Sequence, residues 1–129
     1  MIELKKLHHV AIICSDYEKS KAFYTNTLGF EIKSETYREE KRSYKLDLSL
    51  KGDYLIELFS FPDPPQRITK PEAAGLRHIA FEVEDVDVCV KRLTDSGIYV
   101  EPVRIDEYTG RKFTFLFDPD YLPIELYGQ

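Results

Sequence analysis

The chain has 129 residues, a length that fits one domain, and 43% of them are hydrophobic and 32% charged, as in ordinary globular proteins. The formal net charge of −5 argues against nucleic acid or an anionic membrane as the main partner. No apolar run is long enough for a transmembrane helix, and the first residues lack the pattern of a signal peptide. The expected location is therefore the cytoplasm.

The first half of the chain predicts the order strand, helix and three further strands. Asp16 is a typical N-cap, and Gly29 ends the helix where a left-handed residue is needed. Leucines alternate with polar residues along the third strand, which indicates a half-buried antiparallel strand. The strands are expected at residues 7–14, 30–38, 43–51 and 54–61.

The second half repeats this order after a proline-rich linker at residues 62–75. Asp85 is the expected N-cap of its helix, and Gly97 the expected end. Its strands are expected at residues 76–83, 99–105, 111–117 and 124–127. The sequence thus predicts one α+β domain, residues 1–129, built from two tandem β-α-β-β-β modules, about 1–61 and 76–129, with a mainly antiparallel mixed sheet.

Two histidines and two glutamates occupy equivalent positions in the two modules. His9 and His78 each open the first strand of a module, before Val-Ala or Ile-Ala. Glu57 and Glu125 each stand in an Ile-Glu-Leu sequence of the last strand. A single such residue would be interpreted as a surface or edge-strand side chain, but the repetition favours a shared role.

A divalent metal ion explains this set. Glu57 and Glu125 are flanked by apolar residues, where an unpaired carboxylate costs several kcal/mol. Two imidazoles and two carboxylates suit a transition ion better than calcium or magnesium. His9, Glu57, His78 and Glu125 are therefore the expected metal ligands.

Several nearby residues are assigned to other roles. His8 precedes the ligand His9 and is expected to point to the opposite face of the strand. Arg104, Arg111 and Lys112 flank the late hairpin and are interpreted as a solvated basic edge. Cys14 and Cys89 have no ligand-like spacing.

With these residues the chain resembles the vicinal oxygen chelate superfamily. This superfamily includes glyoxalase I, methylmalonyl-CoA epimerase, the extradiol dioxygenases, and the fosfomycin and bleomycin resistance proteins. The resemblance covers nearly the whole chain and depends on the order and spacing of several short motifs. They are His9-Val10-Ala11-Ile12 with Asp16, Phe23-Tyr24, Leu28-Gly29-Phe30, Leu76-Arg77-His78-Ile79-Ala80-Phe81, and Asp118-Pro119-Asp120 before Ile124-Glu125-Leu126.

The resemblance implies that the paired modules form a cupped sheet around one divalent metal ion (Ni, Zn, Co, Mn or Fe). The glyoxalase I ligand positions fall on His9, Glu57, His78 and Glu125. The implied activity is a glyoxalase I-like lyase that isomerises a 2-oxoaldehyde–thiol hemithioacetal through an enediolate held on the metal. Glu125 is the expected catalytic base and Glu57 its counterpart. The expected partners are a small-molecule substrate, such as a thiol adduct, and a second copy in a homodimer.

The chain departs from this pattern at three places. Ile13 and Phe61 stand where bacterial glyoxalase I commonly carries an arginine and an asparagine that serve glutathione, which leaves the thiol open. Tyr121 replaces the glycine of the usual Asp-Pro-Asp-Gly turn, so this backbone is expected to avoid a glycine-only conformation. Two alternatives remain: another metal-dependent enzyme of the superfamily (epimerase, dioxygenase or thiol transferase), or a non-catalytic module that binds a small ligand.

Overall fold

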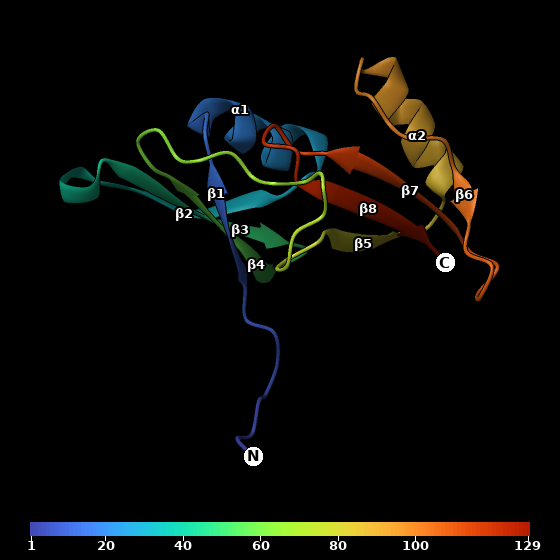
Figure 1. Cartoon of the computed structure of the whole chain (residues 1–129), viewed down its shortest axis with the longest axis horizontal. Helices are drawn as coiled ribbons and strands as arrows, with labels where there is room; N and C mark the ends of the chain where they lie inside the picture. Colours follow the sequence, from blue (N-terminus) through green and yellow to red (C-terminus); the bar gives the residue numbers. More distant parts are fainter. The chain divides into compact units, whose positions relative to one another are not determined.

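The computed structural model describes residues 1–129, which divide into two compact units, 1–66 and 67–129. Each unit follows the predicted β-α-β-β-β order and contains one four-stranded mixed sheet (Figure 1). The α+β fold of tandem modules is therefore confirmed. None of the helices is long and apolar enough to cross a membrane.

The sheet of unit 1 has the strand order β1-β4-β3-β2, in which only β1 and β4 are parallel. Its elements are β1 (Val10–Cys14), α1 (Tyr17–Ala22), the π-helical turn η1 (Phe23–Thr27), β2 (Glu31–Arg38), the 3-10 turn η2 (Glu39–Lys41), β3 (Ser43–Leu50) and β4 (Asp53–Ser60). The expected helix is thus split into α1 and η1. Asp16 caps α1 as predicted, because its carboxylate accepts a hydrogen bond from the Lys19 backbone N–H.

The first strand begins later than predicted. β1 starts at Val10 rather than at residue 7, since its pairing with β4 begins at Val10 and Ile56. The preceding residues lead away from the sheet of unit 1 (Figure 1). His9 therefore stands just outside the strand instead of within it.

The core of unit 1 lies on one face of its sheet. Leu46, Leu48, Ile56 and Leu58 are each at most 1% exposed, as the alternation along β3 predicts. Burial of each such side chain contributes roughly 1.5–3 kcal/mol. The polar residues of β3 consequently face the opposite side of the sheet, together with Glu57.

Unit 2 repeats the topology with the strand order β5-β8-β7-β6, and β5 runs parallel to β8. Its elements are β5 (Ile79–Val83), α2 (Val86–Asp95), β6 (Arg104–Ile105), β7 (Lys112–Phe117) and β8 (Pro123–Gly128). α2 packs against β7 and β8, with Val86, Leu116 and Ile124 buried on this side. The helix and the late strands are where they were predicted.

The strand predicted at residues 99–105 is reduced to Arg104 and Ile105. Glu101 still donates its backbone N–H to the Phe115 carbonyl over 2.9 Å. Pro102, next in the chain, has no N–H to extend the ladder. β6 is therefore a short edge strand.

The turn before β8 gives Tyr121 an uncommon backbone conformation. Tyr121 adopts φ = 65°, the left-handed region in which glycine is favoured. The buried Asp118 stabilises this turn, because its Oδ1 accepts hydrogen bonds from the backbone N–H groups of Asp120 and Leu122, both over 2.9 Å. These bonds hold a conformation that the side chain of Tyr121 disfavours.

Candidate metal centre

In unit 1 the fold brings His9 and Glu57 together. Glu57 of β4 pairs with Ala11 of β1, and paired residues of parallel strands point to the same face. His9 lies two residues before Ala11, so its ring reaches the same face beside that small side chain. His9 Nε2 lies 3.8 Å from Glu57 Oε1.

Unit 2 repeats this arrangement with His78 and Glu125. Glu125 of β8 pairs with Ala80 of β5, and His78 again lies two residues before the alanine. His78 Nε2 lies 3.2 Å from Glu125 Oε2. The duplication seen in the sequence is thus reproduced in the register of both sheets.

The geometry of each pair fits a metal ion. Bonds of about 2.0–2.2 Å to nitrogen and oxygen place neighbouring ligand atoms about 3.3–3.6 Å apart on a tetrahedral, zinc-like ion. The separations of 3.2 Å and 3.8 Å are close to this range. Within neither unit do three or more histidine, cysteine, aspartate or glutamate side chains gather into a metal-binding group. Each unit contains one histidine–glutamate pair.

Glu57 also has partners that the sequence analysis did not identify. Its Oε2 accepts a hydrogen bond of 2.9 Å from the Tyr54 hydroxyl and lies 3.4 Å from Lys45 Nζ. The argument that Glu57 is an unpaired buried charge is therefore wrong. Oε1 faces His9 while Oε2 is held by Tyr54 and Lys45, so Oε1 is the oxygen of Glu57 that could bind an ion.

Asp47 joins these groups from the neighbouring strand β3. It accepts hydrogen bonds from Lys45 Nζ (2.7 Å), Tyr54 Oη (3.1 Å) and Ser34 Oγ (2.7 Å). Burial alone would raise the pKa of Asp47, but these hydrogen bonds outweigh it and lower the pKa. Burial and the two carboxylates raise the pKa of the Tyr54 hydroxyl, which therefore stays a proton donor to Glu57.

Tyr54 also orients the histidine of unit 1. Its ring stacks on His9 with centroids 5.2 Å apart and an interplanar angle of 13°. The His8 ring contacts both, with its Nδ1 2.8 Å from His9 Nδ1 and a T-shaped contact to the Tyr54 ring. The prediction that His8 points to the opposite face is wrong, because residue 8 precedes β1 and strand alternation does not apply to it.

The surroundings of Glu125 in unit 2 are different. Phe115 pairs with Glu125 in the register, at the place that Asp47 takes opposite Glu57. The Phe115 ring also packs on the His78 ring in a T-shaped contact, with centroids 5.2 Å apart. No tyrosine or lysine holds Glu125, so His78 is its one polar side-chain contact within unit 2.

Basic residues form a second feature that sequence reasoning excluded from the site. A cavity of about 410 Å³ in unit 2 is lined by His78 and by Lys70, Arg77 and Arg104. Arg111 and Lys112 are elsewhere: Arg111 lies over the Tyr127 ring at 6.0 Å, and Lys112 pairs with Asp87. Of Arg104, Arg111 and Lys112, only Arg104 therefore lines the same cavity as His78, a candidate metal ligand.

The sequence contains features at Lys45, Asp47 and Tyr54, but these features do not by themselves indicate contact with Glu57. Lys45 and Asp47 occupy the polar positions of the alternating strand β3, which are typical of a solvent-facing surface. Only the antiparallel register with β4 shows that they flank Glu57. Tyr54 lies in the Asp-Tyr-Leu sequence whose second copy contains Tyr121, but no similar contact repeats there.

The family model described as the glyoxalase/bleomycin resistance protein/dioxygenase superfamily matches residues 6–126. The chain belongs to this superfamily, as its motifs and paired modules indicate. It is 67% identical over 126 residues to the uncharacterized protein YwkD of Bacillus subtilis strain 168, with 98% of both chains covered.

Two other similarities bear on the fold and the family. The chain is 32% identical over 123 residues to the human mitochondrial methylmalonyl-CoA epimerase, covering 91% of this chain and 69% of the epimerase. The crystal structure of the glyoxalase family protein from Enterococcus faecalis superposes with a TM-score of 0.88 at 49% identity, covering 95% of this chain and 97% of that one.

Proposed function

We propose that the chain is a divalent-metal-dependent enzyme of glyoxalase I type, with His9, Glu57, His78 and Glu125 as ligands of one transition ion (Ni, Zn, Co, Mn or Fe). The observation that carries the proposal is the repeated histidine–glutamate pair, set beside an alanine in the same register of each sheet. When bound, the ion would polarise a substrate carbonyl and acidify the neighbouring C–H bond.

The proposed substrate is the hemithioacetal of a 2-oxoaldehyde and a low-molecular-weight thiol. Glu125 removes the proton from the carbon that carries sulfur and returns it to the adjacent carbonyl carbon. The product is a 2-hydroxyacyl thioester, so the reaction is an isomerisation that needs no oxidant or reductant. Glu57 is the counterpart of Glu125, but it remains a ligand because Tyr54 and Lys45 hold it.

The unequal surroundings of the two glutamates support a single mobile base. A proton shuttle needs a carboxylate that can move between two carbon atoms, and Glu125 has one polar side-chain contact within its unit. Glu57 has additional contacts to Tyr54 and Lys45. An enzyme that inverts a carbon uses two bases, one on each side of the substrate. Such a reaction would require two carboxylates with equal freedom to move.

An epimerase is the second candidate, favoured by the 32% identity to the human methylmalonyl-CoA epimerase. It would use the same four residues, but Glu57 and Glu125 would exchange protons with opposite faces of a carbon next to a thioester. Assays with (2S)- or (2R)-methylmalonyl-CoA in deuterated water separate the two functions. Inversion with deuterium incorporation would support the epimerase and contradict the lyase.

The lyase is tested with protein stripped of metal and reloaded with nickel, zinc, cobalt, manganese or iron. Each form is assayed with methylglyoxal and glutathione, cysteine or coenzyme A. Thioester formation that requires both the metal and one thiol is the expected result. Tight metal binding without thioester formation from any thiol would contradict the lyase.

Replacing the proposed base gives a sharper prediction. Glu125→Gln is expected to lower the turnover rate by about 10²–10⁴-fold, the usual contribution of a general base. The isosteric amide retains an oxygen that can face the ion, so metal content is measured in parallel by mass spectrometry. Full turnover by a metal-replete Glu125→Gln protein would contradict the assignment.

A further inference from the structure

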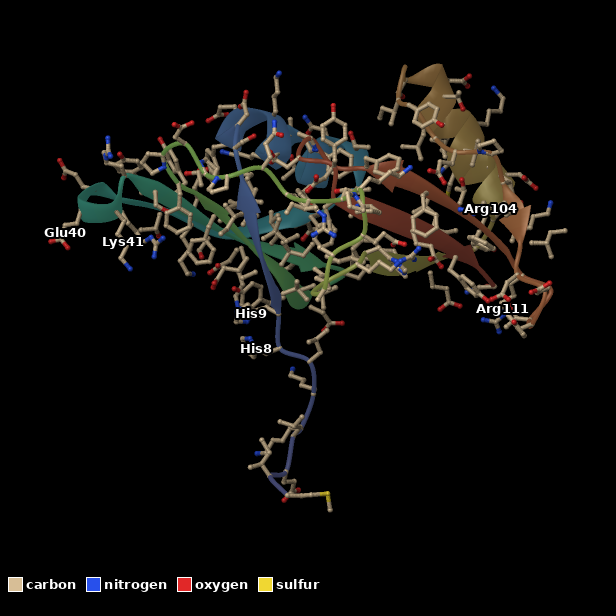
Figure 2. All side chains as sticks on the ribbon, in the orientation of Figure 1. His8, His9, Glu40, Lys41, Arg104 and Arg111 are labelled. Atoms are coloured by element: carbon tan, nitrogen blue, oxygen red, sulfur yellow. The ribbon has the colours of Figure 1, made fainter.

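The cavity beside His78 has a basic end formed by Arg104 of β6. Figure 2 shows Arg104 at the β6 edge of unit 2. The guanidinium carbon lies 4.9 Å from the centre of the Phe113 ring and 5.6 Å from that of Phe115. Stacking on two aromatic rings restrains the guanidinium, which lowers the entropy cost of binding an anion.

The guanidinium retains free hydrogen-bonding capacity. One of its nitrogens donates to Glu101 Oε1 over 3.2 Å, and the Arg104 side chain is 54% exposed. A guanidinium has five N–H donors in a planar fork that matches a carboxylate. Arg104 can therefore receive an anion without losing its contact to Glu101.

The charges around the cavity favour the same type of ligand. Its lining contains three basic side chains, Lys70, Arg77 and Arg104, and two acidic ones, Glu72 and Glu101. Arg77 pairs with Glu72 and Arg104 pairs with Glu101 through one nitrogen, which leaves one positive charge in excess, with Lys70 and the open side of Arg104 as its donors. An organic anion is favoured over a neutral or cationic molecule.

Phe115 connects the basic end to the candidate ligand. Its ring centre lies 5.2 Å from that of His78 and 5.6 Å from the Arg104 guanidinium carbon. A molecule of a few carbon atoms lying across this ring can thus reach both residues. The ring offers an apolar surface for the carbon chain between the two polar ends.

We propose that Arg104 is a specificity-determining residue that binds a carboxylate of the substrate, while the other end of the substrate lies at His78. The inference rests on the proposed function and adds a substrate class to it: small carboxylate-bearing compounds. Simple 2-oxoaldehydes without an anionic group would be poorer substrates. Lys70 contributes positive charge to the cavity, and Arg104 contributes the directed hydrogen bonds.

The test compares two chelators that differ in one carboxylate. Nickel-loaded full-length protein is titrated calorimetrically with acetohydroxamate, and separately with the monohydroxamate of succinic acid. The wild type is expected to prefer the carboxylate-bearing compound by about tenfold or more, the size of a hydrogen bond between charged groups. Arg104→Met is expected to lose this preference while binding acetohydroxamate as the wild type does.

Two further variants control for charge and folding. Arg111→Met removes another arginine that lies over an aromatic ring of the same unit, outside this cavity, and should keep the full preference (Figure 2). Arg104→Lys keeps the charge without the planar fork and should retain part of it. A wild type without the preference, or an Arg104→Met protein that keeps it, would overturn the proposal.

A second measurement separates failure of the metal site from failure of the carboxylate site. If neither hydroxamate binds, the proposed function fails, and metal-free ¹⁵N-labelled protein is titrated with glutarate. The Nε–Hε resonance of Arg104, assigned by its loss in Arg104→Lys, is expected to shift at millimolar glutarate. A resonance that does not move would overturn the carboxylate site independently of the metal.

Discussion

Glu57 and Glu125 are equivalent in sequence but have different neighbours. Glu57 lies opposite Asp47 and contacts Tyr54 and Lys45, whereas Glu125 lies opposite Phe115. Tyr54 and Lys45 restrain Glu57, since both contact its Oε2. Glu57 is therefore the more restrained of the two carboxylates, and Glu125 has more freedom to move.

The Tyr54 hydroxyl provides the most direct test of this difference. Tyr54→Phe keeps the ring that stacks on His9 but removes the hydrogen bonds to Glu57 and Asp47. Loss of such a partner behind a ligand is expected to weaken metal affinity by about 10–100-fold. The affinity is measured by competition with a chromogenic chelator.

Tyr108→Phe is the matched control, because Tyr108 is 90% exposed and belongs to unit 2. It should bind metal as tightly as the wild type. An unchanged affinity in Tyr54→Phe would mean that the hydroxyl does not orient Glu57 for a metal ion.

Tyr121 gives a prediction about stability instead of binding. Its left-handed φ of 65° costs a non-glycine residue about 1–2 kcal/mol, and its side chain is 69% exposed. Tyr121→Gly is therefore expected to change the free energy of unfolding by between zero and about +1 kcal/mol, after the entropy cost of glycine. Tyr121→Val, being β-branched, should destabilise the protein in urea denaturation. Equal stability of the two variants would contradict this account.

At the scale of elements, α1 is attached to β2 by one carboxylate. Glu35 of β2 accepts hydrogen bonds from Tyr17 and from Lys21 Nζ, the latter over 2.7 Å. The ammonium of Lys21, followed by the Tyr17 hydroxyl, lowers the pKa of Glu35. These contacts connect the helix to an edge strand on the core side of the sheet.

The lowered pKa fixes the pH dependence of this attachment. Folded Glu35 binds fewer protons than unfolded Glu35, so its stabilisation is present above the unfolded value of about 4.3 and is lost as pH falls through the folded pKa. Glu35→Gln should cost about 1 kcal/mol or less at pH 7, because the pair is partly exposed. The difference from the wild type should begin to shrink as pH falls below about 4.3 and vanish only below the folded pKa of Glu35 in denaturation experiments.

Glu40→Gln is the control for Glu35→Gln, since Glu40 is an exposed carboxylate in the η2 turn (Figure 2). It should show no comparable loss at pH 7. A difference between wild type and Glu35→Gln that stays constant as pH falls until Glu35 is protonated in the folded protein would mean that the side chain contributes through packing instead of charge.

Local signals in the sequence predicted most of the elements. Asp16 and Asp85 cap their helices as expected, since capping depends on residues within one turn. The ends of strands were less predictable: β1 and β6 are shorter than their apolar patterns, because pairing with β4 and β7 decides where a strand begins. The left-handed Tyr121 was missed because it depends on hydrogen bonds to the side chain of Asp118.

At the scale of the whole molecule, the duplication predicted the candidate site better than any single residue did. Each predicted histidine lies beside its predicted glutamate, and the same register produces both pairs. Tyr54, Lys45 and Arg104 could not be assigned from sequence, because their contacts depend on cross-strand register and side-chain direction. Those residues make the two units chemically different.

Under the proposed function, two histidine–glutamate pairs, one from each kind of unit, hold a single divalent ion. The most direct test is calorimetric titration of metal-stripped protein with nickel and with zinc, for the wild type, His9→Gln, His78→Gln and the exposed control Glu82→Gln. We predict one ion per chain in the wild type and the control, with affinity reduced at least tenfold in both histidine variants. Unchanged binding in either histidine variant, or a wild type that binds neither ion, would contradict the claim.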